Sequence, residues 1–324
     1  MKKIITIFAL CTMLLALSFP SEAQQAVKVP RVAYLASRGG LASNREAFRQ
    51  GLRELGYVEG QNIAIEYRYA EKADRFPELA SELARLKVDV LVAASTPAVL
   101  ALKQATATIP IVFAAAPDPV GGGLVSSLAR PGGNITGLSS LSPELSRRRL
   151  ALFKETFSEA SRVGVVWDPT SPIDATEWTE IEHAARALGM DLLALEVRGP
   201  KDIEPAFQSA ISKKASGLIV LRGFLTNDLQ KRIVDLALKN RMPAIYNDQN
   251  FTEVGGLMSY SPNLGDLFRR AALYVDKILK GAKPGDLSME RPIKFDLVIN
   301  LKTAKQIGVT IPPNVLARAD KVIK

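Results

Sequence analysis

The stretch Val90-Leu-Val-Ala-Ala-Ser-Thr-Pro-Ala-Val-Leu-Ala-Leu-Lys-Gln-Ala105 places a short apolar run directly before a pattern typical of a helix. Ser95, Thr96 and Pro97 stand at the junction between the two. A hydroxyl at a helix start can accept a hydrogen bond from a free backbone N–H, and proline is favoured in the first turn. The stretch therefore predicts a strand, a tight turn and a helix.

This alternation recurs in two blocks of roughly 110 residues each, which indicates two similar lobes rather than one oversized sheet. The first block predicts strands at 31–36, 62–67, 88–93 and 109–114, helices at 44–55, 75–86 and 97–105, and a short helix starting at 120–124. The second predicts strands at 162–167, 191–195, 217–221 and 244–246, and helices at 175–188, 203–213 and 227–240. Strands alternating with helices at this spacing predict an α/β fold with parallel sheets.

The first residues have the pattern of a signal peptide. Lys2 and Lys3 precede an apolar run at 4–19, and Ser21 and Ala23 supply the small residues that signal peptidase requires. We therefore expect an exported, periplasmic protein cleaved near Ala23, although a membrane anchor or a lipid on Cys11 remains an alternative.

We expect the chain to divide into four parts. These are a signal peptide (1–23), an N-terminal lobe (24–139), a C-terminal lobe (140–260) and a tail that crosses back between the lobes (261–324). The lobes should meet near the Gly- and Ser-rich run at 136–142. In the tail, a helix at 263–280 is expected on the N-terminal lobe, and the remainder, with a strand at 294–299, on the C-terminal lobe.

Few residues in the sequence fit known catalytic or metal sites. Cys11 is the only cysteine and His183 the only histidine, so thiol chemistry and the common zinc sites are excluded for the mature chain. Phosphate-loop, dinucleotide and serine-hydrolase motifs are absent from the sequence. We therefore expect no cofactor, no metal and no enzyme activity, although acid–base chemistry by an aspartate stays open.

The net charge of +9 comes from 42 basic and 33 acidic residues. These charges are scattered along the chain, and the one tight run, at residues 147–149, is interpreted as a solvated helix face. Together with export, this argues against a nucleic-acid partner, whereas an acidic membrane surface or protein stays open.

In parallel α/β sheets, ligands bind beyond the carboxyl ends of the strands. Six polar junctions follow predicted strands, three in each lobe, and aromatic residues lie near the same ends. The candidate ligand-binding residues are Ser37, Ser95, Thr96, Asp118, Asp168, Arg222, Tyr246, Asp248 and Tyr260. For the hydroxyls, helix capping alone is the alternative, and for the aromatic residues it is packing in the core.

Several stretches resemble one protein family when they are taken together. They are Phe48-Arg-Gln-Gly-Leu-Arg-Glu-Leu-Gly-Tyr57, Asp74-Arg-Phe-Pro-Glu-Leu-Ala80, Asp118-Pro-Val120, Ala129-Arg-Pro-Gly-Gly-Asn-Ile-Thr-Gly137, Met242-Pro-Ala-Ile-Tyr246, Gly255-Gly-Leu-Met-Ser-Tyr260 and Val298-Ile-Asn-Leu-Lys-Thr-Ala304. The chain after residue 23 resembles the substrate-binding proteins of ABC importers with the type I periplasmic-binding fold, in the branch that includes tryptophan- and tyrosine-binding members.

The resemblance implies two Rossmann-like lobes joined by three hinge crossings. It implies a small-molecule solute, such as an aromatic amino acid, clamped between the lobes of a monomer, and delivery to an ABC permease in the inner membrane without catalysis. An exported sensor subunit that uses the same closure is an alternative, as is an enzyme that uses the interlobe cleft.

The resemblance and the junctions together give a hypothesis for the contacts of an amino-acid solute. Its carboxylate would meet Ser95 and Thr96, its ammonium group Asp168 or Asp248, and its side chain Tyr246 or Tyr260. The chain departs from the family pattern at two places. Arg222-Gly223 replaces an Asp-Pro-like pair, and Asp168 stands where an asparagine is usual. An arginine at the cleft would suit a second acidic group on the solute, and a solvent-facing arginine is the alternative.

Overall fold

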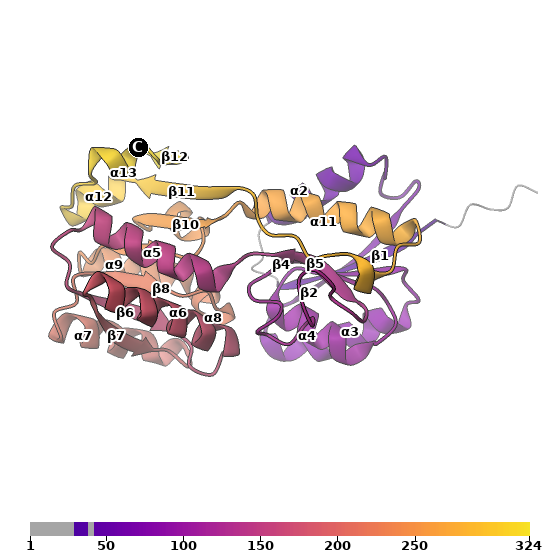
Figure 1. The fold of residues 1–324 in the computed structure, drawn as a ribbon, viewed down its shortest axis with the longest axis horizontal. Coiled ribbons are helices and arrows are strands. Elements are labelled where there is room, and N and C mark those ends of the chain that lie inside the picture. The colour runs from indigo at the N-terminus through magenta and orange to yellow at the C-terminus, as the bar shows by residue number, and fades with distance from the viewer. Residues whose placement is uncertain (1–28, 38–41) are drawn as a thin grey trace, which may run out of the picture.

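The computed structural model describes residues 29–37 and 42–324, so the predicted signal peptide lies outside the described residues. The described chain forms two α/β lobes that lie side by side, each built around its own sheet (Figure 1). This arrangement confirms the predicted fold class. Within those ranges, no helix combines the length and the apolar character needed to cross a membrane.

The N-terminal lobe contains a parallel sheet with the strand order β2-β1-β3-β4-β5. Its strands are β1 (Arg31–Ser37), β2 (Ala64–Ala70), β3 (Val90–Ala93), β4 (Ile111–Ala116) and β5 (Ile135–Ser139). The strands β3 and β4 are buried along their whole length, which explains why their sequences are apolar throughout.

Helices cover both faces of this sheet. The helices α2 (Ala42–Glu54) and α11 (Leu264–Leu279) pack on one face, and η1 (Ala73–Arg75), α3 (Phe76–Arg85) and α4 (Thr96–Ala105) belong to the other. Although α11 comes from the tail of the sequence, it supplies a continuous apolar stripe to the core of this lobe (Figure 1). Gly51 allows the close approach of α2 and α11, because a Cβ there would lie 2.2 Å from the carbonyl oxygen of Arg269.

The C-terminal lobe contains a sheet with the order β12-β11-β10-β9-β8-β6-β7. Its strands are β6 (Arg162–Trp167), β7 (Asp191–Glu196), β8 (Leu218–Val220), β9 (Ala244–Tyr246), β10 (Met258–Pro262), β11 (Phe295–Asn300) and β12 (Lys321–Ile323). The pair β10–β11 is antiparallel, and the other neighbours are parallel.

Helices also cover both faces of the second sheet. One core contains residues of α5 (Ser142–Thr156), α6 (Pro172–Leu188), α12 (Leu301–Ile307) and α13 (Pro313–Leu316). The other contains residues of α7 (Ile203–Ser212), α9 (Gln230–Lys239) and α10 (Asn250–Glu253). The short elements η2 (Pro200–Asp202) and α8 (Phe224–Asp228) complete the lobe.

Three segments of chain connect the lobes (Figure 1). They run from β5 to α5, from β10 to α11, and from η3 (Pro284–Asp286) to β11. Hydrogen bonds tie the segments together. The Ser139 backbone N–H donates to the Glu290 carbonyl (2.8 Å), and the Asn263 N–H donates to the Lys294 carbonyl (3.0 Å). The crossings therefore form one connected hinge.

The structure corrects three details of the sequence prediction. The expected helix at 120–124 is a turn, because three consecutive glycines disfavour helix and Gly123 has a positive φ of 63°. The Gly- and Ser-rich run contains the buried strand β5, so only its last residues cross between the lobes. The third correction concerns Arg149, which is fully buried rather than solvated.

Candidate functional site

The carboxyl ends of β1–β5 and of β6–β10 lie at the hinge side of their lobes, whereas β11 and β12 run in the opposite direction. The chain leaves β5 at Ser139 and enters α5 three residues later, and it leaves β10 at Pro262 and enters α11 two residues later. Because parallel strands end at the same edge of a sheet, these two edges face one another across the hinge. We call them the facing edges, and all six predicted junctions follow strands that end there.

A cavity of about 410 Å³ opens at the facing edge of the N-terminal lobe. It lies beyond β1 and β2 and beside the first residues of α2 and α11. Its lining combines aromatic rings with groups of both charges and is formed by Tyr34, Ala36, Ser37, Ala42, Asn44, Arg45, Tyr69, Glu71, Ala94 and Phe268. The predicted residue Ser37 is therefore part of a cavity wall.

Arg45 is held in this cavity by aromatic residues of β2. Its Nη1 donates a hydrogen bond to the Tyr69 hydroxyl (2.7 Å), and this contact raises the pKa of Arg45. Its guanidinium carbon lies 5.6 Å from the ring centre of Tyr69 and 6.0 Å from that of Tyr67, within the range of cation–π contacts. The two tyrosine rings are parallel. The cation is thus fixed in place and still reaches the cavity.

The other predicted residues of the N-terminal lobe stabilise turns. Ser95 caps α4, because its hydroxyl accepts a hydrogen bond from the Ala98 N–H (3.4 Å), and Thr96 follows, half-buried, as the first helical residue. Asp118 accepts a hydrogen bond from the Gly121 N–H (2.8 Å) and holds the glycine turn after β4. These three residues stand at the facing edge but do not line the cavity.

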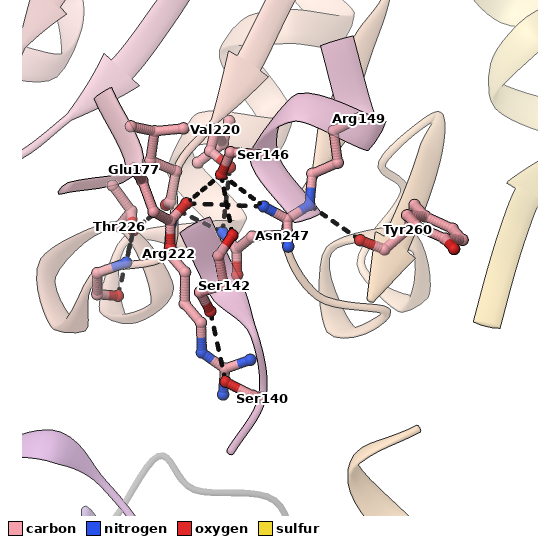
Figure 2. Close-up of polar contacts among 12 residues, drawn as sticks. Ser140, Ser142, Ser146, Arg149, Glu177, Val220, Arg222, Thr226, Asn247 and Tyr260 are labelled. Carbon is pink, nitrogen blue, oxygen red and sulfur yellow. Dashed lines mark hydrogen bonds and ion pairs between the residues drawn. The ribbon is translucent and has the colours of Figure 1, made fainter. Parts of the chain in front are cut away.

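A fully buried ion pair lies behind the facing edge of the C-terminal lobe. Arg149 on α5 and Glu177 on α6 are both 0% exposed, and Arg149 Nη1 lies 3.7 Å from Glu177 Oε2 (Figure 2). The same oxygen accepts a hydrogen bond from the Ser146 hydroxyl (2.5 Å). Arg149 Nε donates to the Tyr260 carbonyl at 2.9 Å. The network therefore ties α5 to α6 and to the strand that leads into the second crossing.

Burial sets the ionisation of this pair. It lowers the pKa of Arg149 to about 10, although the Glu177 carboxylate opposes the shift. It raises the pKa of Glu177, against the effects of Arg149 and of the Ser146 hydroxyl. Arg149 Nη2 and Glu177 Oε1 are buried without hydrogen-bond partners in the described chain. Removing either residue would leave the other as an uncompensated buried charge.

Arg222 follows β8, and it bonds to this network through its backbone rather than its side chain. Its backbone N–H donates to Glu177 Oε2 (3.4 Å). Thr226 Oγ1 accepts from the Gly223 N–H and donates to the Leu221 carbonyl, both at 3.0 Å, so the turn is fixed on either side of the arginine. Figure 2 shows the side chain pointing away from the buried pair, on the side where Ser140 and the first crossing are drawn.

Asp248 and Asn247 come directly after the neighbouring strand β9. Asn247 Nδ2 donates to the Leu221 carbonyl (3.1 Å), and Asp248 Oδ1 accepts from the Asn250 N–H (3.0 Å). Burial raises the pKa of Asp248, although Arg222 and Arg149 oppose the shift. The structure therefore brings two of the predicted residues, Arg222 and Asp248, into one electrostatic group.

Asp168 and Asp174 occupy the turn after β6. Asp168 Oδ1 accepts hydrogen bonds from the Thr170 N–H (2.9 Å) and hydroxyl (2.7 Å), so it holds the turn. Asp174, near the start of α6, is 0% exposed and accepts from the Asp168 N–H at 2.9 Å. Burial raises the pKa of Asp174 to about 7. An acid that changes charge near neutral pH thus lies just behind the facing edge.

The rings of the two predicted tyrosines of the C-terminal lobe pack within that lobe, although Tyr246 is the last residue of β9. Tyr246 is 1% exposed and stacks on Phe251 in the core at a centroid distance of 4.7 Å. The Tyr260 ring stacks on Phe295, at the start of β11, and its hydroxyl accepts from Arg148 at 3.4 Å. For Tyr246, the structure therefore shows packing in the core, which was the alternative to ligand contact for the aromatic residues.

One aromatic pair connects the lobes. Phe224, at the start of α8, packs against the apolar core of the N-terminal lobe, where it meets Phe76 of α3 edge to face. The ring centres lie 6.4 Å apart at an angle of 79°. Because Phe224 is two residues beyond Arg222, the same turn carries a cation and the contact to the other lobe.

Sequence reasoning missed Arg45, Tyr69, Glu71, Asp174 and Glu177. Side chains alternate along a strand, so Tyr67 and Tyr69 share one face of β2, and Glu71 follows just beyond its end; this spacing was visible in the sequence. On α6, Asp174 and Glu177 fall on the stripe that continues with Ile181 and Ala185. Carboxylates on an apolar helix stripe signal a buried polar network.

The arrangement is suited to binding a small polar molecule. The facing edges carry hydroxyls, aromatic rings and groups of both charges, which is the composition of a solute pocket. Across the described ranges, histidine, cysteine and acidic side chains form no cluster that could hold a metal ion.

Known proteins resemble this chain along most of its length. Residues 31–323 match the family described as ABC transporter substrate binding protein. The chain is 26% identical over 280 residues to the tyrosine-binding protein of Clostridioides difficile strain R20291. The aligned region covers 86% of this chain and 80% of that protein.

Two solved structures resemble the whole described fold. A conserved domain protein from Vibrio cholerae has a TM-score of 0.85 and 32% identity, over 91% of this chain and 100% of that chain. The ABC domain from Streptococcus pneumoniae in complex with L-Trp has a TM-score of 0.84 and 26% identity, over 91% of this chain and 99% of that chain. Because the family match spans both lobes and the tail, the protein belongs to the ABC transporter substrate-binding proteins of the type I periplasmic-binding fold, which bind a small molecule for a membrane permease.

Proposed function

We propose that the protein binds an α-amino acid with an aromatic side chain between its lobes. The observation that carries this proposal is the cavity at the N-terminal facing edge, where Tyr34, Tyr69 and Phe268 lie beside Arg45 and Glu71. Aromatic walls suit an aromatic side chain, and groups of both charges suit a zwitterion. The tyrosine-binding relative and the L-Trp complex support the same class of solute.

In this proposal, the solute drives the lobes together. A molecule that contacts both facing edges stabilises the closed form, because only that form makes both sets of contacts. The Phe76–Phe224 pair adds an apolar contact to the closed arrangement. Ser37 at the cavity, and Ser95, Thr96, Asp118, Asp168, Arg222 and Asp248 at the facing edges, supply the polar groups.

The proposal extends to the setting of the protein. The chain acts as a periplasmic monomer, divided as predicted into a signal peptide (1–23) cleaved near Ala23, two lobes (24–139 and 140–260) and a returning tail (261–324). It delivers its solute to an ABC permease of the inner membrane without catalysing a reaction.

Calorimetric titration tests the proposed solute. Tyrosine, tryptophan and phenylalanine should bind the wild-type protein with micromolar dissociation constants, which correspond to a binding free energy of about −8 kcal/mol. Leucine should bind more weakly. Tyr69→Ala should weaken tyrosine binding about 10- to 100-fold, because it removes an aromatic wall and the partner of Arg45.

Tyr57→Ala is the matched control. Tyr57 belongs to the same lobe, but its hydroxyl donates to Asp276, away from the cavity. Its binding curve should match that of the wild type. Equal losses in both variants, or no aromatic amino acid bound by the wild type, would refute the proposal.

A further inference from the structure

The Arg222 side chain forms no ion pair at contact distance among the described residues, although Asp248 lies in the same electrostatic group. None of the ion pairs within that part of the chain includes Arg222, and its Nη1 is buried without a hydrogen-bond partner. A buried cationic donor without a partner is costly, because it has lost its water and gained no anion. A bound anion would supply the missing hydrogen-bond acceptor and counter-charge at the facing edge.

The nearby carboxylates are already engaged elsewhere. Glu177 Oε2 accepts from Ser146 and lies against Arg149, and it meets Arg222 only at the backbone N–H. Asp248 Oδ1 accepts from the Asn250 N–H. The protein thus surrounds the Arg222 guanidinium without neutralising it at hydrogen-bond distance.

The turn that carries Arg222 is rigid and reaches the other lobe. Thr226 fixes Gly223 and Leu221 on either side of the arginine, and Phe224 packs on Phe76. When the lobes are together, this aromatic pair restricts water near the turn. Lower hydration strengthens a charge-assisted hydrogen bond from a guanidinium to an anion.

We propose that Arg222 binds a carboxylate of the solute. This inference rests on the proposed function, and it adds that the solute must carry an anionic group at the facing edge of the C-terminal lobe. The planar guanidinium of an arginine matches a carboxylate in both charge and geometry. It does so better than the ammonium group of a lysine side chain would. The carboxylate is the α-carboxylate of an amino acid or a second acidic group on its side chain.

Matched acids and amides test the inference. Tyrosine, tyrosinamide and 4-carboxyphenylalanine are titrated into the wild type and into Arg222→Gln. If Arg222 meets the α-carboxylate, the variant should bind tyrosine about 10- to 100-fold more weakly and tyrosinamide unchanged. If it meets a side-chain group, the wild type should prefer 4-carboxyphenylalanine, and the variant should lose that preference. Equal effects on acid and amide, or no effect on either acid, would overturn the inference.

Two controls separate binding from folding. Arg232→Gln removes an exposed arginine of the same lobe that pairs with Glu204, and it should leave all titrations unchanged. The melting temperature of Arg222→Gln should equal or exceed that of the wild type, because the cation makes no ion pair within the described chain. A lower melting temperature would assign Arg222 a structural role instead.

The inference is also separable from the identity of the solute. If the wild type binds no aromatic amino acid, the proposed function fails, and a thermal-shift panel of carboxylic acids with their amides then tests Arg222. Stabilisation by an acid, but not by its amide, that disappears in Arg222→Gln supports the inference. A wild-type protein that no acid stabilises overturns it.

Discussion

Arg149→Met is expected to lower the free energy of unfolding by about 3–5 kcal/mol, the range for breaking a buried ion pair. Glu177, which is 0% exposed, would lose the partner 3.7 Å away, and the Tyr260 carbonyl would lose its donor. The change would remove a hydrogen bond between α5 and the strand that enters the second crossing. Urea unfolding followed by circular dichroism measures the loss.

The same run of arginines supplies the control. Arg147 pairs with Glu180 at the surface, so Arg147→Met should cost less than about 1 kcal/mol. The double variant Arg149→Met/Glu177→Leu should recover much of the loss, since an apolar pair leaves no buried charge. If the losses at residues 147 and 149 were equal, or the double variant were less stable than the single one, the account of the buried pair would be wrong.

Asp174→Asn is expected to remove much of the pH dependence of stability near neutrality. Burial raises the pKa of Asp174 to about 7, whereas an aspartate in an unfolded chain ionises near pH 3.9. Between these values the folded protein holds a proton that the unfolded chain has released. The free energy of unfolding of the wild type therefore falls as pH rises from about 4 to about 7.

The amide has no proton to release, and its oxygen can still accept from the Asp168 N–H. At about pH 3 the variant and the wild type should be equally stable, because the acid is then protonated in both the folded and the unfolded states. At about pH 8 the variant should be more stable by up to about 4 kcal/mol, which corresponds to a shift of about three pKa units. Urea unfolding at both pH values tests this. If the free energies of unfolding of the variant and the wild type changed by the same amount between the two pH values, Asp174 would not titrate in this range.

The alternation of strands and helices was enough to predict the two lobes, because periodicity is a local property of the chain. The path of the tail depends on long-range packing. The helix at 263–280 was expected on the N-terminal lobe, and α11 lies there, because its apolar stripe fits the sheet face beside α2. Strand β5 was not predicted, because Gly137 and its serine neighbours read as a linker, and only the neighbouring β4 and Glu290 make it a strand.

Prediction of the site was less complete. Strand ends can be read from the sequence, so the facing edges were predictable together with Ser37 at the cavity. The direction of a side chain beyond a strand depends on the exact backbone turn. Tyr246, the last residue of β9, therefore points into the core, and Arg149 in an arginine run is buried. Both outcomes depend on tertiary packing rather than on local pattern.

The position of α11 also constrains how the protein can be made. A ribosome that has released the first five strands has not yet synthesised the helix that covers one face of their sheet. That apolar face stays uncovered until the part of the second lobe from α5 to β10 has been synthesised. The N-terminal lobe therefore cannot complete its core until α11 is available, and truncation before residue 264 should yield an insoluble chain.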